Sequence, residues 1–460
     1  MGDTPRQNLN GHVLADPHVG TLLFRLSLPA FIGMVVQALY NVVDAIFVGR
    51  GVGKLALAAI SVAMPIHLTL LAVGVLVGIG SSSIISRALG ANDIPRAERA
   101  LGNAMFTVLV LSGLFAVVGS LYLEPIMRLF GATESILPQS MAYGRIILLG
   151  SVVFTFAIAS NNIIRSEGRA KFAMITMLIS AGLNIILDPI FIFGFHMGVR
   201  GAAWATVIAQ TAMALWVLRF FLRKHSVLHL RLSNLRPDRR IMAEMLAIGS
   251  SGVIRQLGGI LLFVTLNRTL RSLGGAMSLA AFGLVHRIMM FIFMSVFGVA
   301  QGLQPVAGFN FGARRYHLTQ RAAKLAALAA VSLTTIGFIV VQLLAHQLIG
   351  IFTTDPELRR QAAYALRMMS LMLPVAGFQV LGASLFQAIG KPVKSLVLTL
   401  SRQVLFLLPL VFVFARMFQL DGIWLAFPVS DALTALITGI FFFRQMRQFD
   451  RMTQAQEVAS

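Results

Sequence analysis

The segments SRALGANDIPRAER, at residues 86–99, and AGFNFGARRYHLTQR, at residues 307–321, decide the fold because they read as two copies of one connection. They lie 222 residues apart, and other glycines and aromatic residues recur at nearly the same offset. Each match alone is weak, but their shared register indicates an internal repeat. The matched pairs are Gly90 with Gly312, Ala91 with Ala313, Arg99 with Arg321, Phe130 with Phe352, Gly168 with Gly390 and, at an offset of 221, Gly201 with Gly422.

Both segments stand between long apolar runs. Of the 460 residues 57% are hydrophobic and 12% are charged, whereas soluble domains average about 25% charged residues. This composition excludes a soluble globule and a disordered chain, and it predicts a protein of the lipid bilayer. A spanning helix needs about 20 apolar residues. Twelve such runs are expected at 21–49, 56–86, 100–123, 141–164, 172–195, 201–222, 242–267, 277–304, 322–348, 363–388, 395–418 and 422–443.

Six runs per repeat is an even number, so both repeats enter the membrane from the same side. The sequence therefore predicts an all-α polytopic membrane protein with two six-helix bundles, related by a pseudo-two-fold axis along the membrane normal, and a cavity between or within them. The expected parts are a cytoplasmic tail at 1–20, an N-terminal bundle at 21–222, a cytoplasmic linker at 223–241, a C-terminal bundle at 242–443 and a cytoplasmic tail at 444–460.

The charge distribution gives the orientation. The chain has 38 Lys+Arg against 17 Asp+Glu, a net charge of +21. Most of the cations fall in the two tails and in the loops on the same side, and cytoplasmic loops are enriched in Lys and Arg. We therefore expect a multi-pass protein of the inner (plasma) membrane with both termini in the cytoplasm. Long apolar runs separate the cations, which excludes a nucleic-acid partner.

Acidic side chains inside the expected spans are the candidates for function, because a charge at the bilayer centre costs at least about 2.5 kcal/mol. Only Asp44, Asp188 and Asp431 lie well inside spans. For Asp431 an internal ion pair is a serious alternative, since Arg287 and Arg402 lie in the same half. The first six spans hold no mid-span Lys or Arg that could neutralise Asp44 or Asp188.

Polar neighbours support a cation site at these two aspartates. Tyr40 precedes Asp44 by four residues and Asn184 precedes Asp188 by four, so each pair shares a helix face. Carboxylate, amide and hydroxyl groups on converging helices can hold a proton or Na⁺. Burial and mutual repulsion would favour the protonated carboxyl groups. Further polar candidates are Asn161 in the fourth span and Thr206 in the sixth.

Three segments resemble the multidrug and toxic compound extrusion (MATE) family: LPAFIGMVVQALYNVVDAIFVGRGVG at 28–53, NIILDPIFIFG at 184–194 and GVRGAAWATVIAQ at 198–210. The similarity covers roughly 21–443 and is greatest to the DinF-like branch. The resemblance implies a cation site at Asp44 and Asp188. It also implies support from Tyr40, Asn161, Asn184 and Thr206, and bending of the first helix at Pro29.

The NorM-like branch of the family differs from this chain. The resemblance places acids for sodium on the seventh and tenth helices of that branch. The corresponding segments here, SSGVIRQLGG at 250–259 and LPVAGFQVLG at 373–382, hold no Asp or Glu. We therefore do not expect a sodium site of that kind in the C-terminal half.

The sequence as a whole predicts a secondary transporter that exports amphiphilic organic cations by alternating-access antiport with H⁺, with Na⁺ as the other candidate ion. Drugs and toxic amphiphiles are the expected partners. The protein is expected to be a monomer, and no cofactor is expected. The alternative is a lipid-linked precursor flippase, which Arg255, Arg287 and Arg402 leave open. An enzyme is not expected, since the nine histidines show no HExxH spacing. Candidate substrate contacts are Asp431, Arg287, Gln37 and Met34.

Overall fold

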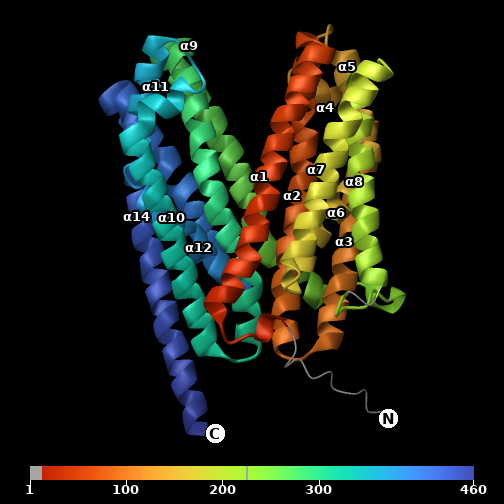
Figure 1. The fold of residues 1–460 in the computed structure, drawn as a ribbon, viewed down its shortest axis with the longest axis vertical. Coiled ribbons are helices and arrows are strands. Elements are labelled where there is room, and N and C mark those ends of the chain that lie inside the picture. The colour runs from red at the N-terminus through yellow and green to blue at the C-terminus, as the bar shows by residue number, and fades with distance from the viewer. Residues whose placement is uncertain (1–12, 224–225, 460) are drawn as a thin grey trace. The chain divides into compact units, whose positions relative to one another are not determined.

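The computed structural model describes residues 13–223 and 226–459, which form helices joined by short turns (Figure 1). Within those ranges there is no strand. The first half contains α1 (Val19–Gly51), α2 (Lys54–Gly90), α3 (Ile94–Leu121), α4 (Leu123–Leu129), α5 (Leu137–Leu149), α6 (Ser151–Ser166), α7 (Ala170–Pro189) and α8 (Val199–Leu222). The second half contains α9 (Arg239–Gly312), α10 (Tyr316–Gly350), α11 (Pro356–Met369), α12 (Leu373–Ala388), α13 (Pro392–Leu400) and α14 (Leu408–Ala459). Two short 3₁₀ helices are η2 (Val13–Ala15) and η4 (Leu232–Leu235), and two π-helical stretches are η3 (Ile190–Gly194) and η5 (Ser401–Leu407).

The helices account for the twelve expected spans. Eight helical stretches of the described chain are long and apolar enough to cross a membrane, and two bent pairs, α5 with α6 and α11 with α12, add one span each. The 74 residues of α9 would extend about 110 Å at 1.5 Å per residue, far more than a bilayer is thick. Its helix breaks at Gly275, and the stretch Pro392–Val458 breaks at Gln419. Each of these two stretches therefore supplies two spans.

Large apolar side chains stand exposed on these helices, as they must where a helix faces lipid instead of water. Examples are Leu121, which is 74% exposed, and Leu343, which is 69% exposed. The expected all-α membrane architecture is confirmed.

Left-handed backbone positions repeat along the chain and confirm the internal repeat. Asn92 has a φ of 60° and Arg314, 222 residues later, has a φ of 59°. Residues other than glycine rarely adopt this conformation. Because this conformation recurs 222 residues later, the corresponding turns of the two halves have the same backbone conformation. Three more pairs agree: Gly53 with Gly275, Gly168 with Gly390 and, at an offset of 221, Gly198 with Gln419.

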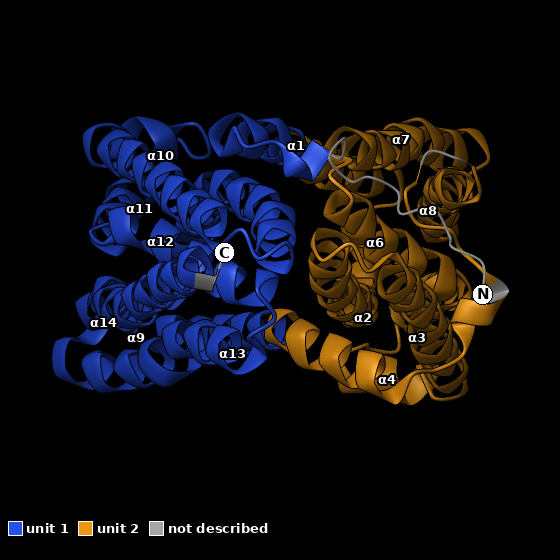
Figure 2. Cartoon of the chain, turned by 90° about the horizontal axis from the view of Figure 1, so that it is seen from below, with its two compact units in different colours: residues 1–31, 253–460 blue, residues 32–252 orange. Residues whose placement is uncertain are grey.

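The chain divides into two compact units, shown in two colours in Figure 2. Unit 1 comprises Met1–Phe31 and Val253–Ser460, and unit 2 comprises Ile32–Gly252. Helices α1 and α9 are therefore each shared between the units. The boundaries expected from the sequence, in contrast, fall between helices, at 222 and 242.

Glycine allows close helix packing inside unit 2, in the segment GIGSSS at 78–83. A Cβ atom on Gly80 would collide with the backbone carbonyl of Met245, and one on Gly249 would collide with that of Leu76. These contacts bring the backbones of α2 and the first turns of α9 together, as small residues do in membrane helix pairs.

Within unit 2, two buried acids, Glu98 on α3 and Glu167 at the end of α6, attach the segment 226–238 to the helices. The Glu167 carboxylate accepts hydrogen bonds from the Ser226 hydroxyl at 2.7 and 2.9 Å and from the Val227 backbone N–H at 3.0 Å. Glu98 accepts one from the His229 backbone N–H at 3.1 Å. Glu167 is 1% exposed, lies in the turn after α6, and burial raises its pKa to about 7.

Candidate functional site

Asp188 is buried in unit 2 and its carboxylate is held by a neighbouring amide. It lies one residue before the end of α7 and is 0% exposed. The Asn184 amide, oriented to satisfy its partners, donates to Asp188 Oδ1 at 3.2 Å and to Oδ2 at 2.6 Å. Its carbonyl then accepts the Thr206 backbone N–H at 3.3 Å. The shared helix face of Asn184 and Asp188 that the sequence predicts is confirmed, and Thr206 on α8 is part of the same network.

Asp44 approaches Asp188 from α1. The two carboxyl groups lie within hydrogen-bonding reach of each other. Asp44 Oδ1 is buried and has no hydrogen-bond partner in the described part of the chain. Two ionised carboxylates are both acceptors and cannot hydrogen-bond each other. This contact is therefore favourable when one of the two groups carries a proton.

Two tyrosines surround the carboxyl pair. The Tyr40 hydroxyl lies within hydrogen-bonding reach of Thr206, and Tyr40 and Tyr143 both lie close enough to Asp44 and Asp188 to interact with them electrostatically. Sequence reasoning missed Tyr143, which comes from α5. The available signal was its position, since it is one of only five tyrosines and lies within an apolar run.

Asn161 lies elsewhere in unit 2. Its amide donates to the Ala173 carbonyl at 2.8 Å and to the Thr176 hydroxyl at 2.6 Å, and its carbonyl accepts from Arg165. Thr176 precedes Asp188 by twelve residues on α7, about 18 Å along a helix. The observed hydrogen bonds of Asn161 are thus remote from the carboxyl pair.

The other candidates on α1 lie on both sides of the boundary between the units. Gln37 and Met34 are half-buried in unit 2, on the turns that precede Tyr40. Pro29 is buried in unit 1, two residues before Phe31, where that unit ends. Helix α1 continues through this proline, although proline removes one backbone hydrogen bond from a helix.

In unit 1 the buried acid is already paired. Arg402 Nε lies 2.7 Å from Asp431 Oδ1, and its Nη2 lies 3.4 Å from Oδ2. Gln379 donates to the Asp431 backbone carbonyl at 2.7 Å, and the Arg402 guanidinium lies 5.0 Å from the Phe293 ring centroid. The partner of Asp431 is thus Arg402 and not Arg287, which is exposed and forms no ion pair among the described residues.

The remaining mid-span cation is Arg255 on α9, which lies 5.5 Å from the Phe297 ring centroid. Because Asp431 neutralises Arg402, the cluster of free cations that a diphosphate-binding flippase would use is reduced. Across 13–223 and 226–459, no group of three or more His, Asp or Glu side chains could hold a metal ion. The arrangement in unit 2 offers two carboxyl groups, two phenols, a hydroxyl and an amide, a set suited to holding and releasing a proton.

Comparison with known proteins agrees with this architecture. The family model described as MatE matches residues 29–190 and 253–413. The multidrug export protein MepA of Staphylococcus saprophyticus is 28% identical over 414 residues, which is 90% of this chain and 91% of that protein. The MepA protein of Staphylococcus aureus is 26% identical over 414 residues. A crystal structure of MATE in the bent conformation has a TM-score of 0.91 at 27% identity, covering 97% of this chain and 99% of that one. A crystal structure of MATE in the straight conformation has a TM-score of 0.90 with the same coverage.

Proposed function

The chain belongs to the MatE family of membrane transporters, and from that premise we propose that it exports amphiphilic organic cations by antiport with H⁺. The single observation that carries the proposal is the contact between the Asp44 and Asp188 carboxyl groups in unit 2. No cation of the described chain forms an ion pair with either group. A proton is what makes this contact favourable, and a cationic substrate would compete with it electrostatically.

The amide of Asn184 favours H⁺ over Na⁺ as the coupling ion. With the amide oriented to satisfy its hydrogen bonds, its N–H groups point at both oxygens of Asp188, and an N–H donor cannot coordinate a metal ion. In the opposite amide orientation the Asn184 carbonyl faces those oxygens and its N–H group donates to the Thr206 hydroxyl at 3.3 Å, which is the arrangement that Na⁺ would select. We therefore take Na⁺ as the second candidate and assign the site to H⁺.

The cycle that follows is alternating access. A proton taken up at Asp44 and Asp188 removes negative charge from the site, substrate affinity falls and the substrate leaves. We assign the accompanying movement to α1, which carries both Asp44 and Pro29. The driving force is adequate, since one pH unit is worth about 1.36 kcal/mol and 100 mV about 2.3 kcal/mol per charge. We also propose that the protein is a monomer of the DinF-like branch in the inner membrane, with both termini in the cytoplasm.

Proton release on substrate binding tests this proposal. Because linkage is reciprocal, a proton that weakens substrate binding must leave when substrate binds. Ethidium added to purified protein in weak buffer should acidify the solution, and Asp44→Asn and Asp188→Asn should not show this. Asp431→Asn is the matched control, since that acid is already paired with Arg402. Efflux from proteoliposomes driven by a Na⁺ gradient, and not by a pH gradient, would refute the assignment to H⁺.

A further inference from the structure

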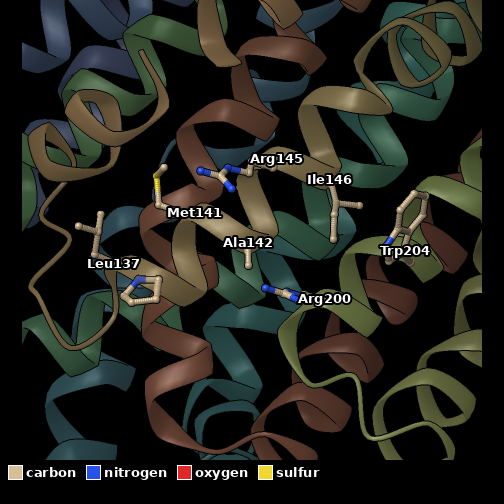
Figure 3. A pocket seen from close by; sticks show the side chains of 8 residues that line it. Leu137, Met141, Ala142, Arg145, Ile146, Arg200 and Trp204 are labelled. Atoms are coloured by element: carbon tan, nitrogen blue, oxygen red, sulfur yellow. The ribbon is translucent and has the colours of Figure 1, made fainter. Parts of the chain in front are cut away.

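A cavity of about 610 Å³ opens between α5 and α8 within unit 2 (Figure 3). Two arginines face it, Arg145 from α5 and Arg200 from the first turn of α8, and Figure 3 shows them on either side of Ala142. The side chains of Leu137, Ile146 and Trp204 line the same cavity. The site therefore combines two cations with an apolar wall, and it is separate from the carboxyl pair.

Nothing in the described chain neutralises the two arginines. The residues lining the cavity include no acid, and neither Arg145 nor Arg200 forms an ion pair with a described residue. Both side chains are exposed. Two like charges across one cavity repel each other, and an anion between them converts that repulsion into two attractive contacts. Guanidinium groups suit phosphate in particular, because their N–H groups match two of its oxygens.

The position of the cavity indicates that the anion carries an apolar tail. Arg200 is at the start of α8, and Leu222, at its other end, leads toward the segment 226–238. In Figure 1 the starts of α5 and α8 lie at the end of unit 2 opposite that segment. Trp204 is 37% exposed, and tryptophan prefers the membrane interface. Arginine and tryptophan at the end of a spanning helix are thus placed at the depth of lipid head groups.

We propose that this cavity binds an anionic phospholipid. The phosphate lies between Arg145 and Arg200, and an acyl chain lies against Leu137, Ile146 and Trp204. A phospholipid with a net negative charge is preferred over phosphatidylcholine because the choline of the latter cancels the charge that the two arginines attract. The proposal does not depend on the transported substrate or on the coupling ion.

Quenching of Trp204 by brominated lipid tests the proposal, because bromine quenches tryptophan only at short range. The protein is reconstituted in phosphatidylcholine nanodiscs that contain a small fraction of brominated phosphatidylglycerol or of brominated phosphatidylcholine. The Trp204 signal is the difference between the unaltered protein and Trp204→Phe, since the chain has only 3 Trp. We expect the phosphatidylglycerol to bind about 30-fold more tightly, which is about 2 kcal/mol at 1.4 kcal/mol per tenfold.

The double variant Arg145→Gln/Arg200→Gln should lose this preference, and Arg145→Lys/Arg200→Lys should keep part of it. Arg268→Gln/Arg271→Gln is the matched control, because it removes two other exposed arginines and should keep the full preference. Equal quenching by both brominated lipids in the unaltered protein would overturn the proposal, and so would an equal loss in the control. Displacement of the lipid by millimolar glycerol 3-phosphate would instead identify a soluble phosphate compound as the occupant and reject the lipid.

Discussion

The two units repeat one backbone but hold their buried acids in opposite ways. In unit 2, Asp44 and Asp188 face each other with no described cation to pair them, and in unit 1 Asp431 is paired with Arg402. The position that corresponds to Asp44 at the offset of 222 is Leu266. The two halves thus share the turns between their helices, as the repeated left-handed residues show. They do not share their buried charges.

The acid pair of unit 2 can therefore change its charge by binding a proton, whereas the ion pair of unit 1 keeps its charges. An acid bonded to a guanidinium is already neutralised, so adding a proton to it breaks a favourable contact. Two carboxyl groups in contact are stabilised by a proton, because it allows a hydrogen bond between them and removes their repulsion. The acid pair of unit 2 is therefore suited to ion coupling. The ion pair of unit 1 is suited to a permanent link between η5, which carries Arg402, and α14, which carries Asp431.

The largest expected effect is on transport through the unit 2 pair. Asp188→Asn should reduce ethidium efflux from cells by up to about 100-fold, because the coupling free energy between proton and substrate, up to about 3 kcal/mol, is lost. The initial efflux rate at matched protein abundance is the measurement. Asp431→Asn should retain most of the efflux. Comparable losses in the two variants would mean that the units are not specialised as we infer.

The next effect is on stability and concerns the unit 1 pair. Arg402→Gln leaves Asp431 buried without its cation and should destabilise the protein by about 2 kcal/mol. The value is below the 3 to 5 kcal/mol of a fully buried pair, because the Arg402 side chain is 27% exposed. A lower Tm in detergent measures it. The double variant Arg402→Gln/Asp431→Asn should recover most of the loss, and a double variant as unstable as the single one would contradict the role of the pair.

The sequence predicted the fold and singled out Asp44 and Asp188, which the structure brings together, because apolar runs and lone mid-span charges are strong signals in a membrane protein. It could not decide which of the other polar residues contact this pair. Asn161 and Asn184 look equivalent in the sequence, yet the hydrogen bonds of Asn161 go to Ala173 and Thr176, while Asn184 contacts Asp188. The position of Tyr143 near the carboxyl pair and the pairing of Asp431 with Arg402 also depend on how each helix is rotated about its axis. That rotation is set by helix packing, which cannot be read from one sequence.

A smaller effect tests the hydrogen bonds around the unit 2 pair. Asn184→Ala removes two donors from Asp188 and should slow ethidium efflux about tenfold, since a hydrogen bond to a charged group is worth about 1.5 kcal/mol or more. Asn162→Ala is the matched control, because among the described residues the Asn162 amide donates within its own helix, to the Ile158 carbonyl at 3.0 Å. It should leave the rate within about twofold. Equal slowing in both variants would remove Asn184 from the site.

The smallest effect concerns the attachment of 226–238, which is a further difference between the units. Glu167 stands beside the repeated turn at Gly168, whereas Ile389 stands beside Gly390. The pKa of Glu167 is raised to about 7 by burial, against the opposing effects of Ser226, Val227 and Arg169. Glu167 therefore binds a proton more tightly when the segment 226–238 is attached than when it is detached. Attachment is strongest below about pH 4.5, near the ordinary pKa of glutamate, and weakens as pH rises through 7.

Between pH 6 and pH 8 the free energy that favours attachment of the segment 226–238 should fall by about 1 kcal/mol. The chain has no cysteine, so a nitroxide on Ser233→Cys, at an exposed position of the segment, reports its motion alone. Its mobile fraction should rise over this pH range and should stay flat in Glu167→Gln, which keeps an acceptor for Ser226 but cannot ionise. A nitroxide on Ser272→Cys in unit 1 is the control and should show no pH dependence. A rise that persists in Glu167→Gln would show that Glu167 is not the group that controls the attachment.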